Sequence, residues 1–150
     1  MAVISIADVL HHAQEFESML ADYYHDVAEH SSKEGVKMLS DYMSRHRIRI
    51  AEQLAKLPPE RVNRICSTPL HYEPQAADCR CFEGVELPPD ATAAQVLDVA
   101  VTFDECLIKL YRQVAQQPVD EDVRELFEGL IHSEERDEIE KKKIKAMDYF

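Results

Sequence analysis

The chain has 150 residues, of which 31% are charged, and a formal net charge of -12 at pH 7. This length fits one domain that can bury a hydrophobic core without disulfide bonds. The negative charge argues against nucleic acid or an anionic membrane as the main partner, because phosphate groups bind to basic surfaces. The sequence offers neither a membrane-spanning pattern nor an N-terminal secretory signal, so we expect a cytosolic protein.

Apolar residues at helical spacing predict four helices, over residues 6–29, 33–56, 92–117 and 120–147. Ser5 is a suitable N-cap for the first helix, Pro58 and Pro59 end the second, and Pro118 ends the third. Residues 58–91 hold most of the prolines, three of the four cysteines and little periodicity. This segment is therefore predicted to be a long crossover.

The lengths of the connections predict the topology. Short links make the first and second helices antiparallel, and likewise the third and fourth, whereas a crossover of this length can run along the whole bundle. The second and third helices are then parallel. Glycine is scarce, with three residues, and strand-like alternation is absent outside the crossover. The sequence predicts one all-α domain over residues 1–150, a four-helix bundle with up-down-down-up topology.

Each predicted helix carries an acidic residue or a histidine in the middle of its apolar stripe. These residues are Glu17, His46, Asp104, Glu134 and Asp137. A buried carboxylate must take up a proton, find a cationic partner or bind a metal, because an unpaired buried charge is very costly. A single metal centre inside the bundle would explain why all four helices carry such a residue in their apolar stripe.

A structural interpretation remains open beside the metal site. Glu17 and Asp104 could instead be carboxylates at the edge of the core, each bonded to a tyrosine such as Tyr24 or Tyr111, or to His46. Either interpretation places these residues inside the bundle.

The motifs around these residues resemble those of a known family. Glu17 is followed seven residues later by Tyr24, Asp104 is followed seven residues later by Tyr111, and the fourth helix reads Phe127-x-x-Leu130-Ile131-x-x-Glu134-x-x-Asp137. With its long second connection, the chain resembles the ferritin-like superfamily, and the rubrerythrin branch more than the cage-forming ferritins. The resemblance implies one glutamate from each of the first and third helices and a Glu-x-x-His pair from each of the others, together holding two irons.

The chain departs from this pattern on three helices. The third helix offers Asp104 in place of glutamate, with Glu105 beside it as an alternative ligand. The second helix reads Met43-x-x-His46. Methionine is a soft donor and cannot bridge two irons as a carboxylate does, so one ion is expected more readily than two.

The fourth helix reads Glu134-x-x-Asp137, with Glu135 and Glu138 available in a shifted register. A single ion would be held by Glu17, His46 and Glu134, with Asp104 and Asp137 as further oxygen donors.

Other residues that can bind metals or react with oxidants lie outside the bundle centre. Cys79 and Cys81 in the crossover, with Cys66 and His71, could form a zinc or iron–sulfur clip. The cysteines could instead form a redox-sensing dithiol or be neutral loop residues. Cys106 is expected to pack as a small apolar residue. The remaining candidate, His11-His12 with Glu15, is expected to be a solvated group.

Three functions are consistent with the sequence. The first is a ferritin-like metal-binding protein, with iron as the expected metal and at most weak oxidase or peroxide chemistry. The second is a metal-free scaffold that acts as a binding or adaptor module through the crossover and the C-terminal residues Ile144, Met147, Tyr149 and Phe150. The third is a cysteine-based redox or metal sensor. The family resemblance also implies a homodimer.

Overall fold

The computed structural model describes residues 5–57, 65, 68–75 and 77–147. These residues form four α-helices and one short 3₁₀ helix, with no named strand among them: α1 (Ile6–His30), α2 (Glu34–Ala55), η1 (Cys79–Phe82), α4 (Ala93–Ala115) and α5 (Glu121–Met147). The predicted all-α four-helix bundle is confirmed. Among the helices described, none combines the length and the apolar character that crossing a bilayer would need.

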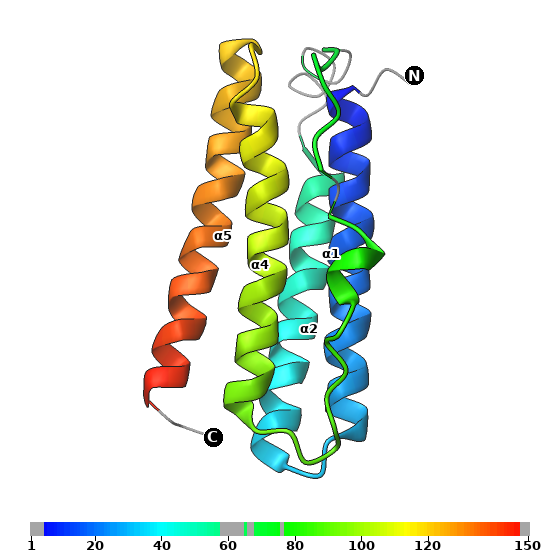
Figure 1. Ribbon diagram of the computed structural model, residues 1–150, viewed down its shortest axis with the longest axis vertical. Coiled ribbons are helices and arrows are strands. Elements are labelled where there is room, and N and C mark those ends of the chain that lie inside the picture. Colours follow the sequence, from blue (N-terminus) through cyan, green and yellow to red (C-terminus); the bar gives the residue numbers. More distant parts are fainter. Residues whose placement is uncertain (1–4, 58–64, 66–67, 76, 148–150) are drawn as a thin grey trace.

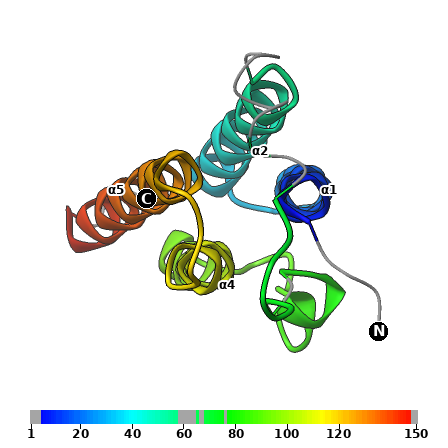
Figure 2. The same ribbon diagram turned by 90° about the horizontal axis from the view of Figure 1, so that it is seen from above.

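The helices run in the order that the connection lengths predicted. In Figure 1, α1 descends, α2 ascends, the crossover returns along the bundle, α4 ascends and α5 descends. The pairs α1–α2 and α4–α5 are therefore antiparallel hairpins, and α2 and α4 are parallel. Seen from above in Figure 2, the four helices surround a common centre.

Local sequence signals fix where the helices begin. The Ser5 hydroxyl accepts a hydrogen bond from the Asp8 backbone N–H, and the Asp8 carboxylate accepts one from the Ser5 N–H at 2.9 Å. Thr92 and Gln95 form the same reciprocal capping box at the start of α4. Each box satisfies two backbone donors that the helix cannot satisfy itself, and so fixes the helix start.

The crossover forms backbone hydrogen bonds near both ends of α1. The Ile6 N–H donates to the Thr68 carbonyl at 3.2 Å, and the Ser32 N–H donates to the Pro89 carbonyl at 2.8 Å. Midway between these points, the Phe82 ring of η1 lies 4.7 Å from the Phe103 ring of α4, centroid to centroid. The crossover therefore covers the seam between α1 and α4, as Figures 1 and 2 both show.

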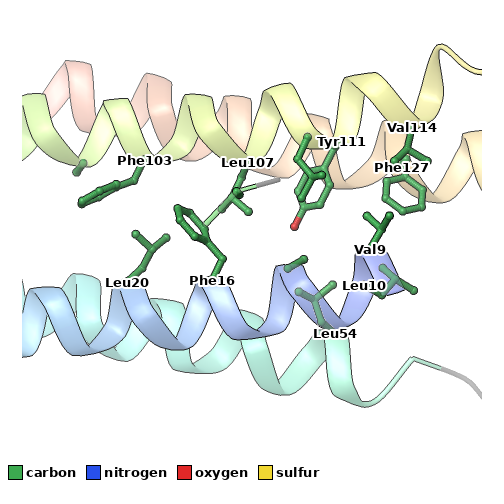
Figure 3. Close-up of a cluster of buried hydrophobic side chains, with 14 of the residues drawn as sticks. Val9, Leu10, Phe16, Leu20, Leu54, Phe103, Leu107, Tyr111, Val114 and Phe127 are labelled. Carbon is green, nitrogen blue, oxygen red and sulfur yellow. The ribbon is translucent and has the colours of Figure 1, made fainter. Parts of the chain in front are cut away.

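The hydrophobic core follows alternating steps of three and four residues along each helix. Phe16 and Leu20 of α1 face Phe103 and Leu107 of α4, and all four side chains are fully buried (Figure 3). The same spacing continues through Tyr111, which is also buried. This periodicity places every inward side chain in a layer with residues from the other helices. One of these layers is charged.

Candidate functional site

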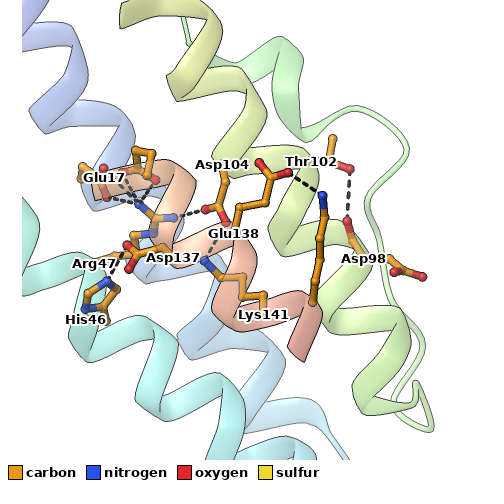
Figure 4. Close-up of polar contacts among 11 residues, drawn as sticks. Glu17, His46, Arg47, Asp98, Thr102, Asp104, Asp137, Glu138 and Lys141 are labelled. Atoms are coloured by element: carbon orange, nitrogen blue, oxygen red, sulfur yellow. Dashed lines mark hydrogen bonds and ion pairs between the residues drawn. The ribbon is translucent and has the colours of Figure 1, made fainter. Parts of the chain in front are cut away.

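Every helix contributes one buried charged side chain to the middle of the bundle. These side chains are Glu17 of α1, Arg47 of α2, Asp104 of α4 and Glu134 of α5, and none is more than 3% exposed. Figure 4 shows the Arg47 guanidinium between Glu17 and Asp104. We call these four residues the central cluster.

The Arg47 guanidinium bonds to all three carboxylates. Its Nη1 lies 3.2 Å from both oxygens of Glu17, and 2.9 Å and 3.2 Å from the two oxygens of Glu134. Its Nη2 donates to Asp104 Oδ1. A guanidinium has five N–H donors in a planar fork and stays charged, so it can serve several carboxylates at once. Arg47 thus joins the α1–α2 hairpin to the α4–α5 hairpin.

A second buried cation lies beside the central cluster. Lys141, two turns after Glu134 on α5, is 7% exposed, and its Nζ donates to Asp104 Oδ2 at 2.7 Å. Asp104 therefore has a cation at each oxygen. Two cations face three carboxyl groups, so one proton on a carboxyl group would make the assembly neutral.

Burial supplies the physical reason for that proton. It raises the pKa of Glu17 to about 8, against the opposing effect of Arg47 and with further upward contributions from Glu134 and Asp104. Burial also raises the pKa of Asp104 to about 6, although Arg47 and Lys141 both favour its charged form. Glu17 is therefore the carboxyl group that holds a proton at neutral pH.

Two tyrosines border the central cluster. Burial raises the pKa values of Tyr24 and Tyr111 well above their ordinary value, so both phenols stay neutral. The Tyr24 hydroxyl is buried and has no hydrogen-bond partner among the described residues. On α2, the Ser44 hydroxyl donates to the Ala21 carbonyl of α1 at 2.8 Å and links the two helices. Tyr24 and Tyr111 thus enclose the charges without taking part in the ion pairs.

His46 and Asp137 form a separate pair at the edge of the bundle. His46 Nε2 lies 2.9 Å from Asp137 Oδ2, and their side chains are 30% and 19% exposed. The imidazole stacks on the Tyr42 ring, with an interplanar angle of 4° and 6.4 Å between centroids. Partial burial raises the pKa of Asp137, but His46, Lys141 and Arg47 together outweigh it, so the net pKa is below the ordinary value.

The five expected ligands are thus divided between two places. Glu17, Asp104 and Glu134 meet at the centre, whereas His46 and Asp137 bond to each other at the edge. The three alternative carboxylates point elsewhere: Glu105 is exposed, Glu135 pairs with Arg112, and Glu138 pairs with Lys142. The α2 residue that faces the three central carboxylates is Arg47, which the sequence analysis did not single out.

The sequence nevertheless carried a signal for Arg47. The α2 positions that alternate in steps of four and three are Val36, Ser40, Met43, Arg47, Ile50 and Leu54. Arg47 fits this pattern, and His46 lies one residue, or about 100°, away from it around the helix. An arginine at a core position indicates that acidic partners are buried nearby, because an isolated buried charge is too costly.

The central donor set does not fit the family's metal pair. Both terminal nitrogens of the Arg47 guanidinium, Nη1 and Nη2, are already bonded to the three carboxylates that would hold the ions, and a guanidinium has no lone pair to donate to a metal. Met43 is buried in the core and offers only a thioether. Within the described part of the chain, no group of three or more His, Cys, Asp or Glu side chains could hold a metal ion.

The remaining candidates lie away from the centre. His11 Nε2 is 2.7 Å from Glu15 Oε1, and both side chains are exposed. Cys81 and Cys106 are partly buried free cysteines. Cys66, Tyr149 and Phe150 lie outside the described residues, as does the side chain of Cys79. Ile144 packs against the core, and Met147 is exposed.

Comparison with known proteins identifies the fold. No protein-family profile matches the chain, and no curated protein matches it in sequence. A crystal structure of a candidate ferritin-like diiron-carboxylate protein from Thermotoga maritima has a TM-score of 0.64 to this structure, with 17% identity and 97% of each chain covered. The protein therefore has the ferritin-like four-helix fold. At this identity the similarity establishes the fold alone.

Proposed function

We propose that this protein is a ferritin-like binding or adaptor module whose centre is held by buried ion pairs instead of by metal. One observation carries the proposal: the Arg47 guanidinium bonds to Glu17, Asp104 and Glu134 at once. A cation that is part of the chain fills the role that bound cations have in diiron-carboxylate bundles, namely to compensate buried carboxylates. Oxidase or peroxide chemistry would need a metal that this donor set does not favour.

The alternative is an iron protein, with Glu17, His46, Asp104, Glu134 and Asp137 as ligands. It is favoured by the structural neighbour, a candidate ferritin-like diiron-carboxylate protein that aligns over 97% of both chains, and by the three carboxylates that meet at the centre. For these to bind iron, Arg47 would have to leave a site in which it is 1% exposed. That move would leave the three buried carboxyl groups without their guanidinium partner, which is costly.

Metal content distinguishes the two functions. Wild-type protein would be incubated with ferrous iron without oxygen, desalted and analysed for metals, beside Arg47→His and His46→Ala. We expect no stoichiometric iron in wild type. Arg47→His replaces the guanidinium with an imidazole donor beside three carboxylates, a set that suits iron or zinc, and we expect it to gain metal. About one or two irons per wild-type chain, lost in His46→Ala, would contradict the proposal and support the iron protein.

An adaptor acts through the surfaces that contact its partners. We extend the proposal to a cytoplasmic homodimer that offers the crossover and the C-terminal end of α5 to its partners. Exposed apolar side chains support contacts there and on α2, since Met147 is 58% exposed and Met38 and Tyr42 of α2 are 65% and 47% exposed. Light scattering of the purified protein would test the dimer, and a monomer at micromolar concentration would remove that part of the proposal.

A further inference from the structure

The 3₁₀ helix of the crossover brings one cysteine beside another on α4. Cys81 lies in η1, next to Phe82, whose ring packs 4.7 Å from Phe103. Cys106 is one turn after Phe103 on α4, and its thiol interacts with the thiol of Cys81 where η1 contacts α4. Both cysteines are free, partly buried and packed against the core. The packing of η1 on α4 therefore holds the two sulfur atoms together.

We propose that Cys81 and Cys106 form a reversible disulfide that locks the crossover onto α4, with a low-molecular-weight disulfide as the oxidant. This reaction goes beyond the proposed adaptor function and does not depend on it. The disulfide would make the attachment of the crossover to α4 depend on the ratio of thiols to disulfides in the surroundings. The crossover is one of the surfaces that we propose to contact partners.

The exchange proceeds in two balanced steps. The Cys81 thiolate attacks one sulfur of the small disulfide, forming a mixed disulfide and releasing one small thiolate. Cys106 then loses its proton to solvent and attacks the Cys81 sulfur, which forms the Cys81–Cys106 bond and releases the second small thiolate. The protein thiols lose two hydrogens in total, and the small disulfide is reduced to two thiols.

The surroundings of Cys106 assign these separate roles. Burial, and then the hydrogen bond with Cys81, raise the pKa of Cys106 to about 12. Cys106 thus keeps its proton in the resting protein and is the poorer nucleophile for a first attack. Cys81 makes the first attack, and Cys106 resolves the mixed disulfide because the fold keeps it next to Cys81.

The test isolates the pair in a Cys66→Ser/Cys79→Ser background. Folded protein would be incubated with oxidised glutathione, and free thiols would be alkylated before intact-mass and peptide analysis. We expect a mass lower by two hydrogens, no retained glutathione, and one peptide that links Cys81 to Cys106. Adding Cys106→Ser should leave one glutathione on Cys81, and Cys106→Ala provides the same test if the serine variant fails to fold.

Two controls separate the folded pair from general thiol reactivity. The same reaction in urea should form the link more slowly, because the unfolded chain no longer holds the two sulfur atoms together. The wild-type chain should give the same linked peptide and return to free thiols on reduction. A link that forms equally fast in urea, glutathione retained on both cysteines, or pairing of Cys81 with Cys66 or Cys79 in wild type would each overturn the proposal.

Discussion

Two ionic contacts between α2 and α5 begin at neighbouring residues of α2 and differ in almost every physical respect. Arg47 reaches Glu134 in the core, where the side chains are 1% and 4% exposed, whereas His46 reaches Asp137 at the edge, where they are 30% and 19% exposed. One residue corresponds to about 100° around a helix, and that rotation separates a buried site from one that is partly exposed to solvent. The difference in solvation decides how much each contact contributes to stability.

The comparison also shows why the central cluster is sensitive to the loss of any one member. In the core, removing one partner leaves the others charged and without solvent, which costs far more than the pair itself contributes. At the edge, water replaces a lost partner. We therefore expect substitution of Arg47 to lower the free energy of unfolding strongly. Substitution of Glu17 should have an effect that depends on pH, and substitution of Asp137 should have a small effect.

The largest expected effect follows from Arg47→Met. This change removes the cation and leaves three buried carboxyl groups with only Lys141 to compensate them. We expect the free energy of unfolding to fall by about 3–5 kcal/mol, measured by urea denaturation at pH 7. Arg45→Met is the matched control, because Arg45 is 66% exposed and pairs with Asp41 on the same helix. If both variants were equally stable, the guanidinium would not hold the centre together.

An intermediate effect is expected from Glu17→Gln, and it should depend on pH. The pKa of Glu17 is raised from 4.5 to about 8 in the folded protein, so between these values the folded chain holds a proton that the unfolded chain has released. The contribution of Glu17 to the free energy of unfolding is therefore greatest below pH 4.5 and falls as pH rises toward 8. This contribution falls by at most about 1.4 kcal/mol for each pH unit.

Glutamine cannot titrate, so the stability of wild type relative to Glu17→Gln should decline between pH 5 and pH 8. Urea denaturation across this range would measure it. Asp22→Asn is the control, because Asp22 is exposed on the same helix, and its difference from wild type should stay flat. A flat profile for Glu17→Gln as well would show that Glu17 holds no proton in the folded protein.

The smallest effect is expected from Asp137→Asn. Its lowered pKa contributes stability that is present above the unfolded value of 3.8 and is lost as pH falls through the folded value. We expect a loss below about 1 kcal/mol at pH 6, which disappears in acid, with a similar loss for His46→Gln. A loss at Asp137 as large as the loss at Arg47 would contradict the contrast between edge and core.

The fold could be predicted from the sequence because its determinants are local. Ser5 with Asp8 and the prolines after α2 and α4 mark where helices begin and end, and the lengths of the connections decide which helices are parallel. The carboxylates at positions 17, 104 and 134 were also recognisable, since each interrupts an apolar stripe at a regular step.

The composition of the site was harder to predict for a physical reason. His46 and Arg47 are adjacent, and the family resemblance directed attention to the histidine, whereas the packing of α2 against α1 turns the arginine inward. An arginine also has a long side chain that can usually reach solvent, so its burial depends on three partners from the other helices. Likewise, the contact of Cys81 with Cys106 depends on the path of the crossover, which residue spacing does not specify.

The distribution of the charges between the two hairpins has a consequence for assembly. The α1–α2 hairpin brings one acid and one base to the centre, whereas the α4–α5 hairpin brings two acids and Lys141. Two copies of the α4–α5 hairpin packed on each other would confine four carboxylates with two ammonium groups. The α1–α2 hairpin supplies a guanidinium to these carboxylates, so the buried charges favour the native pairing over self-pairing of the α4–α5 hairpin.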